Sequence, residues 1–107
     1  MTEAQFQRSV IELAQRAKWK VAHFRPAQNA KGAWRTPVAA DGAGFPDLVL
    51  VRDRVIFAEL KTDKGRLRPE QREWLDALAF AGVNDAVIWR PRDWRVIEET
   101  LLGKESL

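Results

Sequence analysis

The amino-acid sequence predicts an α/β domain in which helices flank a mixed β-sheet, in the order α-β-β-β-α-β-α. Three features lead to this prediction. The N-terminal segment has the apolar spacing of an amphipathic helix. Two runs rich in Val, Ile, Leu and Phe follow each other across a short polar turn, and a helical segment separates the second run from one more strand.

The first helix is predicted from Thr2 to about Lys18, and Thr2 with Gln5 has the form of a capping box at its start. Its apolar residues fall on one helical stripe, namely Phe6, Val10, Leu13, Ala14 and Ala17. Glu3 projects at about 60° from Phe6 on a helical wheel, inside this stripe. We therefore expect Glu3 on the inward face. Alternatively, it is a solvated first-turn residue favoured by the helix dipole.

A short strand is expected from Lys20 to Arg25, and the sequence then loses all periodicity between Pro26 and Gly44. Proline and glycine recur in this second stretch, which predicts one long loop. Loops of such length in compact domains are uncommon and often functional. The loop is therefore either a binding element, in which Trp34 and Arg35 contact bases, or a solvated connection that Trp34 anchors to the core.

Two strands, a helix and a further strand are predicted next. The segments Phe45 to Val51 and Val55 to Lys61 should form an antiparallel hairpin around the turn Arg52-Asp53-Arg54. A helix begins near Pro69 and ends at Gly82. Since this helix precedes the strand Asp85 to Trp89, that strand should pair in parallel with residues 55–61 through a right-handed crossover.

The C-terminal part should pack through its tryptophans. Asp93 can cap a closing amphipathic helix that begins near Trp94. Trp74, Trp89 and Trp94 lie on faces that should be buried, either in the core or in a dimer interface. A domain this small buries a modest fraction of its surface, so dimerisation would stabilise it.

The composition limits what the chain can be. A length of 107 residues fits a single domain over residues 1–107, and 46% hydrophobic with 31% charged residues is typical of a globular protein. The net charge of +3 permits a polyanionic partner without singling one out. The chain has no cysteine and one histidine, His23, which excludes thiolate and multi-histidine metal sites. No signal peptide or membrane-spanning run is recognisable, so we expect a cytoplasmic protein with no membrane partner.

The hairpin brings three charged residues together at one end. Glu59 and Lys61 lie two residues apart on one strand and therefore point to the same face. If Arg52 to Arg54 forms the turn, Asp47 lies opposite Glu59, with Cβ atoms about 5 Å apart. Two carboxylates this close repel each other unless one is protonated or a cation lies between them.

A hard divalent cation would relieve this repulsion, because Mg²⁺ is commonly held by one or two carboxylates together with phosphate oxygens. Lys61 could then orient a water molecule or neutralise charge on a phosphate in the transition state. The pattern therefore predicts hydrolysis of a phosphodiester. In the alternative interpretation, Asp47 caps a strand and Glu59 and Lys61 are ordinary polar residues. The apolar strands around them favour the functional interpretation.

Three stretches of the sequence resemble, in order, motifs of the VRR-NUC family, the virus-type replication-repair nucleases of the PD-(D/E)xK superfamily. They are Gly44-Phe45-Pro46-Asp47-Leu48, Phe57-Ala58-Glu59-Leu60-Lys61 and Leu67-Arg68-Pro69-Glu70-Gln71. These look like the family's GFPDL, F-x-ELK and L-x-PEQ motifs, and the similarity continues to Trp89-Arg90-Pro91. The resemblance implies a restriction-endonuclease-like core and a nuclease that requires Mg²⁺ or Mn²⁺.

The resemblance also implies roles for single residues. Asp47 and Glu59 would be metal ligands, and the backbone carbonyl of Leu60 a further one. Lys61 would be the catalytic lysine, with Gln71 supporting the catalytic site from the following helix. Compact members from phages and prophages are known as homodimers that cut branched DNA such as four-way (Holliday) junctions, and the resemblance implies the same here.

Two further positions follow from the comparison with the family pattern. Glu3 matches an acidic residue that many members carry on the first helix, which would make it an additional metal ligand. Arg68 is a departure, since members similar to this chain often have Ser there. We interpret Arg68 as an extra phosphate contact.

Basic side chains cluster directly after Lys61 and could position a nucleic-acid backbone without reading its sequence. They are Lys64, Arg66, Arg68 and Arg72. Alternatively, these charges are only solvated. Two other functions also fit the chain: a DNA-binding module that has lost catalysis, and a sequence-specific restriction endonuclease. The intact Asp47, Glu59 and Lys61 set favours an enzyme, and a chain this short leaves little beyond residues 26–44 for reading bases.

Overall fold

The computed structural model describes residues 1–24, 27–28, 34–35 and 39–103, and for residues 27–28 and 34–35 it describes the backbone alone. The elements in these ranges are α1 (Glu3–Arg16), β1 (Lys20–His23), β2 (Ala27–Gln28), β3 (Trp34–Arg35), β4 (Leu48–Val51), β5 (Val55–Leu60), α2 (Pro69–Phe80), β6 (Ala86–Trp89), the 3-10 helix η1 (Pro91–Asp93) and α3 (Trp94–Leu102). The α/β class with helices flanking a mixed sheet is confirmed.

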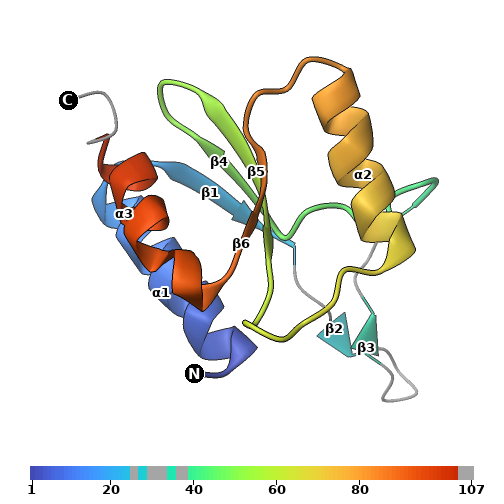
Figure 1. Ribbon diagram of the computed structural model, residues 1–107, viewed down its shortest axis with the longest axis horizontal. Helices are drawn as coiled ribbons and strands as arrows, with labels where there is room; N and C mark the ends of the chain where they lie inside the picture. Colours follow the sequence, from blue (N-terminus) through green and yellow to red (C-terminus); the bar gives the residue numbers. More distant parts are fainter. Residues whose placement is uncertain (25–26, 29–33, 36–38, 104–107) are drawn as a thin grey trace.

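The main sheet has four strands in the order β1-β4-β5-β6. β1 pairs antiparallel with β4, β4 pairs antiparallel with β5, and β5 pairs in parallel with β6. The parallel pairing of β6 with β5, the strands on either side of α2 in the chain, is as predicted. Figure 1 shows α1 and α3 together on one side of this sheet and α2 on the other side.

The β4–β5 hairpin has the predicted register. Val51 lies opposite Val55, and Val49 lies opposite Phe57. The side chains of β5 alternate between the two faces of the sheet, because successive residues of a strand point in opposite directions. Ile56, Ala58 and Leu60 therefore face the α1 and α3 side, where they are fully buried. Phe57 and Glu59 consequently face the α2 side.

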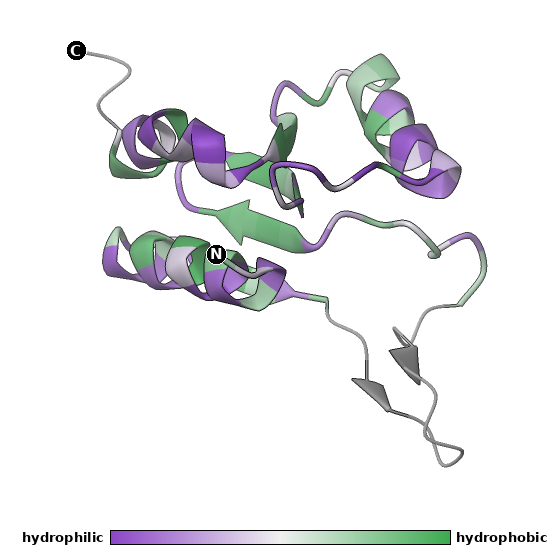
Figure 2. Ribbon diagram, turned by 60° about the horizontal axis from the view of Figure 1, so that its bottom comes forward, coloured by the Kyte–Doolittle hydropathy of each residue, from purple (hydrophilic) through white to green (hydrophobic). Residues whose placement is uncertain are grey.

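The hydrophobic core lies between the sheet and the pair α1 and α3. From α1 it receives Phe6, Val10 and Ala14, which belong to the predicted apolar stripe. The C-terminal part of the chain contributes Trp89, Ile97 and Leu101, and Trp94 packs against the cluster. In Figure 2 the central strands have the colour of apolar residues, whereas each helix carries both apolar and polar residues. None of the described helices combines the length and the apolar character that a membrane span requires.

The start of α1 confirms the capping box but not the inward position of Glu3. The backbone N–H of Gln5 donates to Thr2 Oγ1 over 3.1 Å, and the N–H of Thr2 donates to Gln5 Oε1 over 2.8 Å. Residues 1–5 are all exposed, and the first buried position is Phe6. The prediction of an inward Glu3 is therefore wrong, because the buried stripe begins one turn further along the helix.

Two further predictions need correction. Residues 26–44 are not one continuous loop, because β2 and β3 pair antiparallel as a separate two-stranded sheet. The side chains of Trp34 and Arg35, expected to contact bases, lie outside the described part of the structure.

Asp93 occupies the cap position of α3 without a side-chain capping bond. Its Oδ2 instead accepts from the N–H of Arg90 over 2.9 Å, which closes the short helix η1.

Arg52, in the turn of the hairpin, joins the C-terminal ends of α1 and α3. Its Nη1 donates to the carbonyl oxygens of Ala17 over 2.9 Å and Leu101 over 3.1 Å. Its guanidinium carbon lies 4.5 Å from the ring centre of Trp19, whose Nε1 also donates to the carbonyl of Leu101. A cation at two helix C-termini and over an aromatic face stabilises both contacts.

We expect Arg52→Ala to lower the free energy of unfolding by about 2 kcal/mol, because two carbonyl groups lose a charged donor and Trp19 loses its stacking partner. Urea denaturation measures the change. Arg95→Ala is the matched control, since the side chain of Arg95 is 92% exposed and should change the stability by no more than about 0.5 kcal/mol. Equal losses in the two variants would contradict the role of Arg52.

Candidate active site

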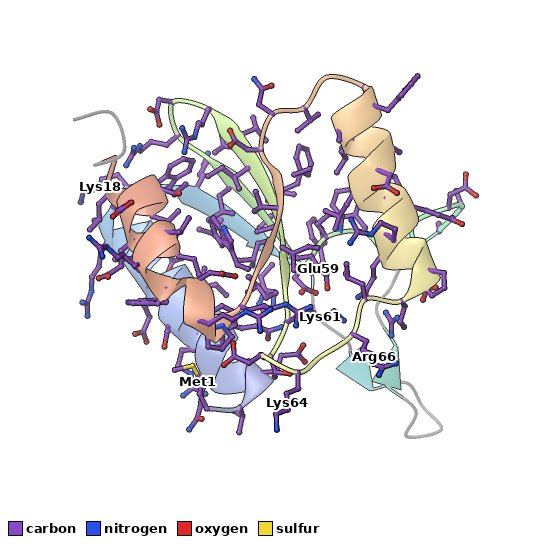
Figure 3. The ribbon with its side chains drawn as sticks, viewed as in Figure 1. Met1, Lys18, Glu59, Lys61, Lys64 and Arg66 are labelled. Atoms are coloured by element: carbon purple, nitrogen blue, oxygen red, sulfur yellow. The ribbon has the colours of Figure 1, made fainter. Side chains whose placement is uncertain are left out.

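Four residues expected to form the site meet at one end of the sheet. Asp47 directly precedes β4, Glu59 and Lys61 lie at the end of β5, and Gln71 is in the first turn of α2. Figure 3 shows Glu59 and Lys61 at this end of β5, with Lys64 and Arg66 further along the loop that leads to α2. Residues from three separate elements therefore converge on one place.

Asp47 is held by backbone contacts on both sides. Its Oδ2 accepts from the N–H of Leu60 over 2.9 Å, and its carbonyl oxygen accepts from the N–H of Phe24. Extending the β4–β5 register by one residue places Asp47 opposite Glu59, as the sequence predicted. The side-chain bond to Leu60 thus fixes the first carboxylate beside the second.

Glu59 is a buried acid with an incomplete set of partners. Its side chain is almost fully buried, and its Oε2 accepts from Gln71 Nε2 over 3.0 Å. Lys61 Nζ lies 3.9 Å from the same oxygen. The other oxygen, Oε1, is buried and has no hydrogen-bond partner among the described residues. A buried polar atom without a partner is costly and therefore indicates a missing ligand or a functional role.

The surroundings of Glu59 disfavour its charged form. Burial, followed by the neighbouring charge of Asp47, raises the pKa of Glu59 from 4.5 to about 8, and Lys61 and Arg68 act in the opposite direction. A proton or a cation must therefore compensate the two carboxylates. The unpartnered Oε1 of Glu59, beside Asp47, fits a hard divalent cation that prefers oxygen ligands.

Gln71 links the acid pair to the start of α2. Its Oε1 accepts from the N–H of Arg68 over 2.9 Å, while its Nε2 donates to Glu59. One amide thus satisfies a backbone donor at the helix start and a buried carboxylate, which requires both an acceptor and a donor group. A glutamate at this position would offer no donor to Glu59 near neutral pH. This requirement explains why a glutamine stands here.

The segment before Asp47 packs tightly on α2. A Cβ atom at Gly44 would lie 2.6 Å from the carbonyl carbon of Glu70 and 2.7 Å from its Cγ, and Gly44 has a φ of +85°. Phe45 contacts Trp74 edge to face, with ring centres 5.0 Å apart, and Trp74 Nε1 donates to the carbonyl of Asp41. These contacts position the approach to Asp47 relative to α2.

The basic residues expected to bind nucleic acid lie around this site. Lys64, Arg66, Arg68 and Arg72 are all exposed. Arg68 also forms an ion pair with Glu70 over 2.9 Å, and Arg72 lies 3.7 Å from Asp76. The four side chains therefore lie on the loop after β5 and at the start of α2, and Arg68 is close enough to act on the charge of Glu59.

The structure does not bring Glu3 into this group. Glu3 is exposed, and within the described ranges no three His, Cys, Asp or Glu side chains gather as a possible metal site. Among the described residues, Asp47 and Glu59 thus form a pair of acids that no third potential metal ligand of these types joins. Arg90, whose guanidinium donates to the loop after Lys61, is not among the residues predicted for the site. In the sequence its only signal is its place in the Trp89-Arg90-Pro91 stretch.

A four-stranded mixed sheet flanked by helices, with an Asp directly before β4 and a Glu and a Lys at the end of β5, matches a nuclease fold of the PD-(D/E)xK class. The VRR-NUC domain model matches residues 6–92 of the 107-residue chain. The chain therefore belongs to the VRR-NUC family and is a nuclease domain whose substrate is DNA. Comparison with curated proteins and with solved structures gave no match.

We expect the stability of the metal-free protein to decrease as the pH rises from 4.5 to about 8 and then to level off. Over this interval the unfolded chain has released the Glu59 proton that the folded chain retains, so rising pH favours unfolding. Below 4.5 both states are protonated and the effect disappears. Urea denaturation in the presence of a chelator measures this dependence. Glu59→Gln should flatten the curve, whereas an unchanged slope in this variant would contradict the assignment.

Gly44→Ala should destabilise the protein more than Gly82→Ala. Both glycines have positive φ angles, +85° and +94°, but a Cβ at Gly82 meets nothing within 4 Å. Each variant loses about 1 kcal/mol through left-handed strain, and Gly44→Ala alone also displaces Glu70. Denaturation midpoints compare the two variants. Equal midpoints would show that the close packing at Gly44 is unimportant.

Proposed function

We propose that this chain is a DNA endonuclease that depends on Mg²⁺ or Mn²⁺. The observation that supports this proposal most directly is the pairing of Asp47 with Glu59, a buried acid with one unpartnered oxygen. A buried pair of carboxylates without a compensating cation is unfavourable. A divalent cation held by the two carboxylates would offset that cost.

Asp47 and Glu59 are the proposed metal ligands, together with the backbone carbonyl of Leu60. A divalent cation bound there would supply Lewis acidity and would offset charge on the phosphate. Gln71 keeps the Glu59 carboxylate oriented through the 3.0 Å hydrogen bond. Glu3 is not included among the proposed ligands, because it is exposed and does not join the acid pair.

Lys61 is the proposed catalytic lysine. Its side chain is 13% exposed, and its ammonium group faces the same oxygen of Glu59 that Gln71 binds. In this position it can hold a water molecule or stabilise the negative charge that develops on the scissile phosphate. The exposed cations Lys64, Arg66, Arg68 and Arg72 would then bind the flanking phosphates without selecting a sequence.

We further propose that residues 1–107 form a single domain, that the protein acts in the cytoplasm, and that it assembles as a homodimer on branched DNA such as four-way junctions. Branched DNA as the preferred substrate is supported by the resemblance to compact family members. A dimer is supported by apolar side chains that the described residues leave uncovered. Phe80 is 96% exposed, and Val51 and Val55 are 41% and 42% exposed.

We expect the full chain to cleave an end-labelled four-way junction in the presence of Mg²⁺ or Mn²⁺, and to do so faster than a linear duplex of the same arm sequence. Asp47→Asn and Lys61→Ala should each lower the cleavage rate by at least about a hundredfold, because the first weakens metal binding and the second removes a positive charge beside the reacting phosphate. Circular dichroism should show that both variants remain folded. Arg95→Gln, on the far helix α3, is the control that retains activity.

The outcomes separate the proposed function from its rivals. Equal rates on junction and duplex would reject the branched substrate but retain the nuclease. Cleavage of the duplex at one sequence would identify a restriction-type enzyme. Binding without cleavage, with either metal and on every substrate, would identify a non-catalytic DNA-binding module. Full activity of Lys61→Ala would remove this residue from the mechanism.

A further inference from the structure

Arg90 makes two short contacts with the loop that follows Lys61. Its Nη1 donates to the carbonyl oxygen of Thr62 over 2.6 Å and to that of Gly65 over 2.7 Å. The loop between β5 and α2 carries the exposed cations Lys64 and Arg66. Arg90 therefore holds the loop on which part of the basic cluster lies.

We propose that Arg90 is a positioning residue, which holds the loop of residues 62–68 so that Lys64 and Arg66 bind the DNA backbone. This inference rests on the proposed function and deepens it. One nitrogen of Arg90 binds two carbonyl oxygens. The partial negative charges of these carbonyls are therefore compensated by the guanidinium of Arg90. The cationic side chains of the loop remain exposed on its surface.

The position of Arg90 is itself well fixed by the backbone. β6 pairs in parallel with β5, and the N–H of Lys61 donates to the carbonyl of Trp89 over 3.0 Å. The N–H of Arg90 donates to Asp93 Oδ2. The residue is thus anchored to the sheet immediately beside Lys61, and its half-buried side chain reaches the loop from a rigid element.

A second contact connects the same two segments. The N–H of Arg92 donates to Asp63 Oδ1 over 3.1 Å, and its side-chain Nη1 lies 3.3 Å from the carbonyl oxygen of Asp63. Within the loop, the N–H of Gly65 donates to the carbonyl of Thr62 over 3.2 Å. The turn at residues 62–65 is therefore held at three carbonyls by Arg90, directly after β6, and by Arg92 of η1, and Arg90 makes the two shortest contacts.

Arg90 should affect DNA binding more than the chemical step. Lys61 is held by its own backbone bond to Trp89, and Gln71 is held by Glu59, so neither depends directly on the Arg90 side chain. A lysine at position 90 would retain the positive charge. It would lack the rigid planar donor group that binds two carbonyl oxygens in a fixed geometry.

The test compares Arg90→Lys and Arg90→Gln with the wild-type full chain on a junction substrate with Mg²⁺. Both variants are expected to raise KM about tenfold, which corresponds to the loss of one charge-assisted hydrogen bond, and to leave kcat within about twofold. The dissociation constant of the same DNA in a chelator, measured by fluorescence anisotropy, should rise by the same factor. Arg95→Gln, which removes the same charge from α3, should change neither quantity.

A double-mutant cycle tests whether Arg90 acts through the loop. In a chain that carries Lys64→Gln and Arg66→Gln, Arg90→Lys should raise KM by much less than tenfold, because the side chains that it positions are gone. If Arg90 variants do not fold, Arg92→Gln tests the same connection from an exposed side chain. It should raise KM about twofold in the parent chain and not in the Lys64→Gln, Arg66→Gln background.

Several results would overturn the inference. A wild-type KM in Arg90→Lys with a raised KM in Arg90→Gln would show that the charge alone matters. A loss of kcat at unchanged KM would place Arg90 in the chemical step, and a lower melting temperature with unchanged KM would make it only structural. An unaltered effect in the Lys64→Gln, Arg66→Gln background would exclude action through the loop. Failure of the wild-type chain to bind or cleave DNA would instead reject the proposed function.

Discussion

The burial of Glu59 next to Asp47 is the constraint on which the functional end of the molecule depends. An isolated carboxylate in the interior is strongly disfavoured, and a second acid beside it adds repulsion. Three neighbouring groups stabilise this arrangement. The amide of Gln71 donates to Glu59, the ammonium of Lys61 lies near the same carboxylate, and the N–H of Leu60 donates to Asp47. Most of the neighbouring structure serves to hold these few groups in place.

The constraint extends along the chain through α2. Gln71 can reach Glu59 only if the helix starts close to the sheet, and the start of the helix is set by the tight contact between Gly44 and Glu70. Gly44 also begins the segment that delivers Asp47. Asp47 and Gln71, which lie far apart in the sequence, are thus linked by one packing contact, whereas Glu59 is placed by strand β5.

Much of this arrangement was predictable because it depends on local periodicity. The alternation of β4 and β5 and the short polar turn predicted the hairpin register, and that register placed Asp47 opposite Glu59. The capping box at Thr2 is likewise a local pattern. The predicted inward position of Glu3 was wrong. A helical wheel shows the direction of a side chain but not how far along the helix the contact with the sheet extends. The role of Arg90 was missed, since its partners are carbonyl groups 25 and 28 residues earlier, and backbone acceptors leave no mark in the sequence.

The alternation of β5 also makes the candidate site depend on correct strand pairing. Its odd and even positions serve opposite layers: Ala58 and Leu60 belong to the apolar interior, whereas Glu59 belongs to the site. A slip of one residue in pairing would exchange these faces, placing Glu59 among apolar side chains and turning Leu60 toward the α2 side. A misaligned or half-formed sheet would therefore lack the facing pair of acids, so that the candidate site exists only in molecules whose strands have reached the native pairing.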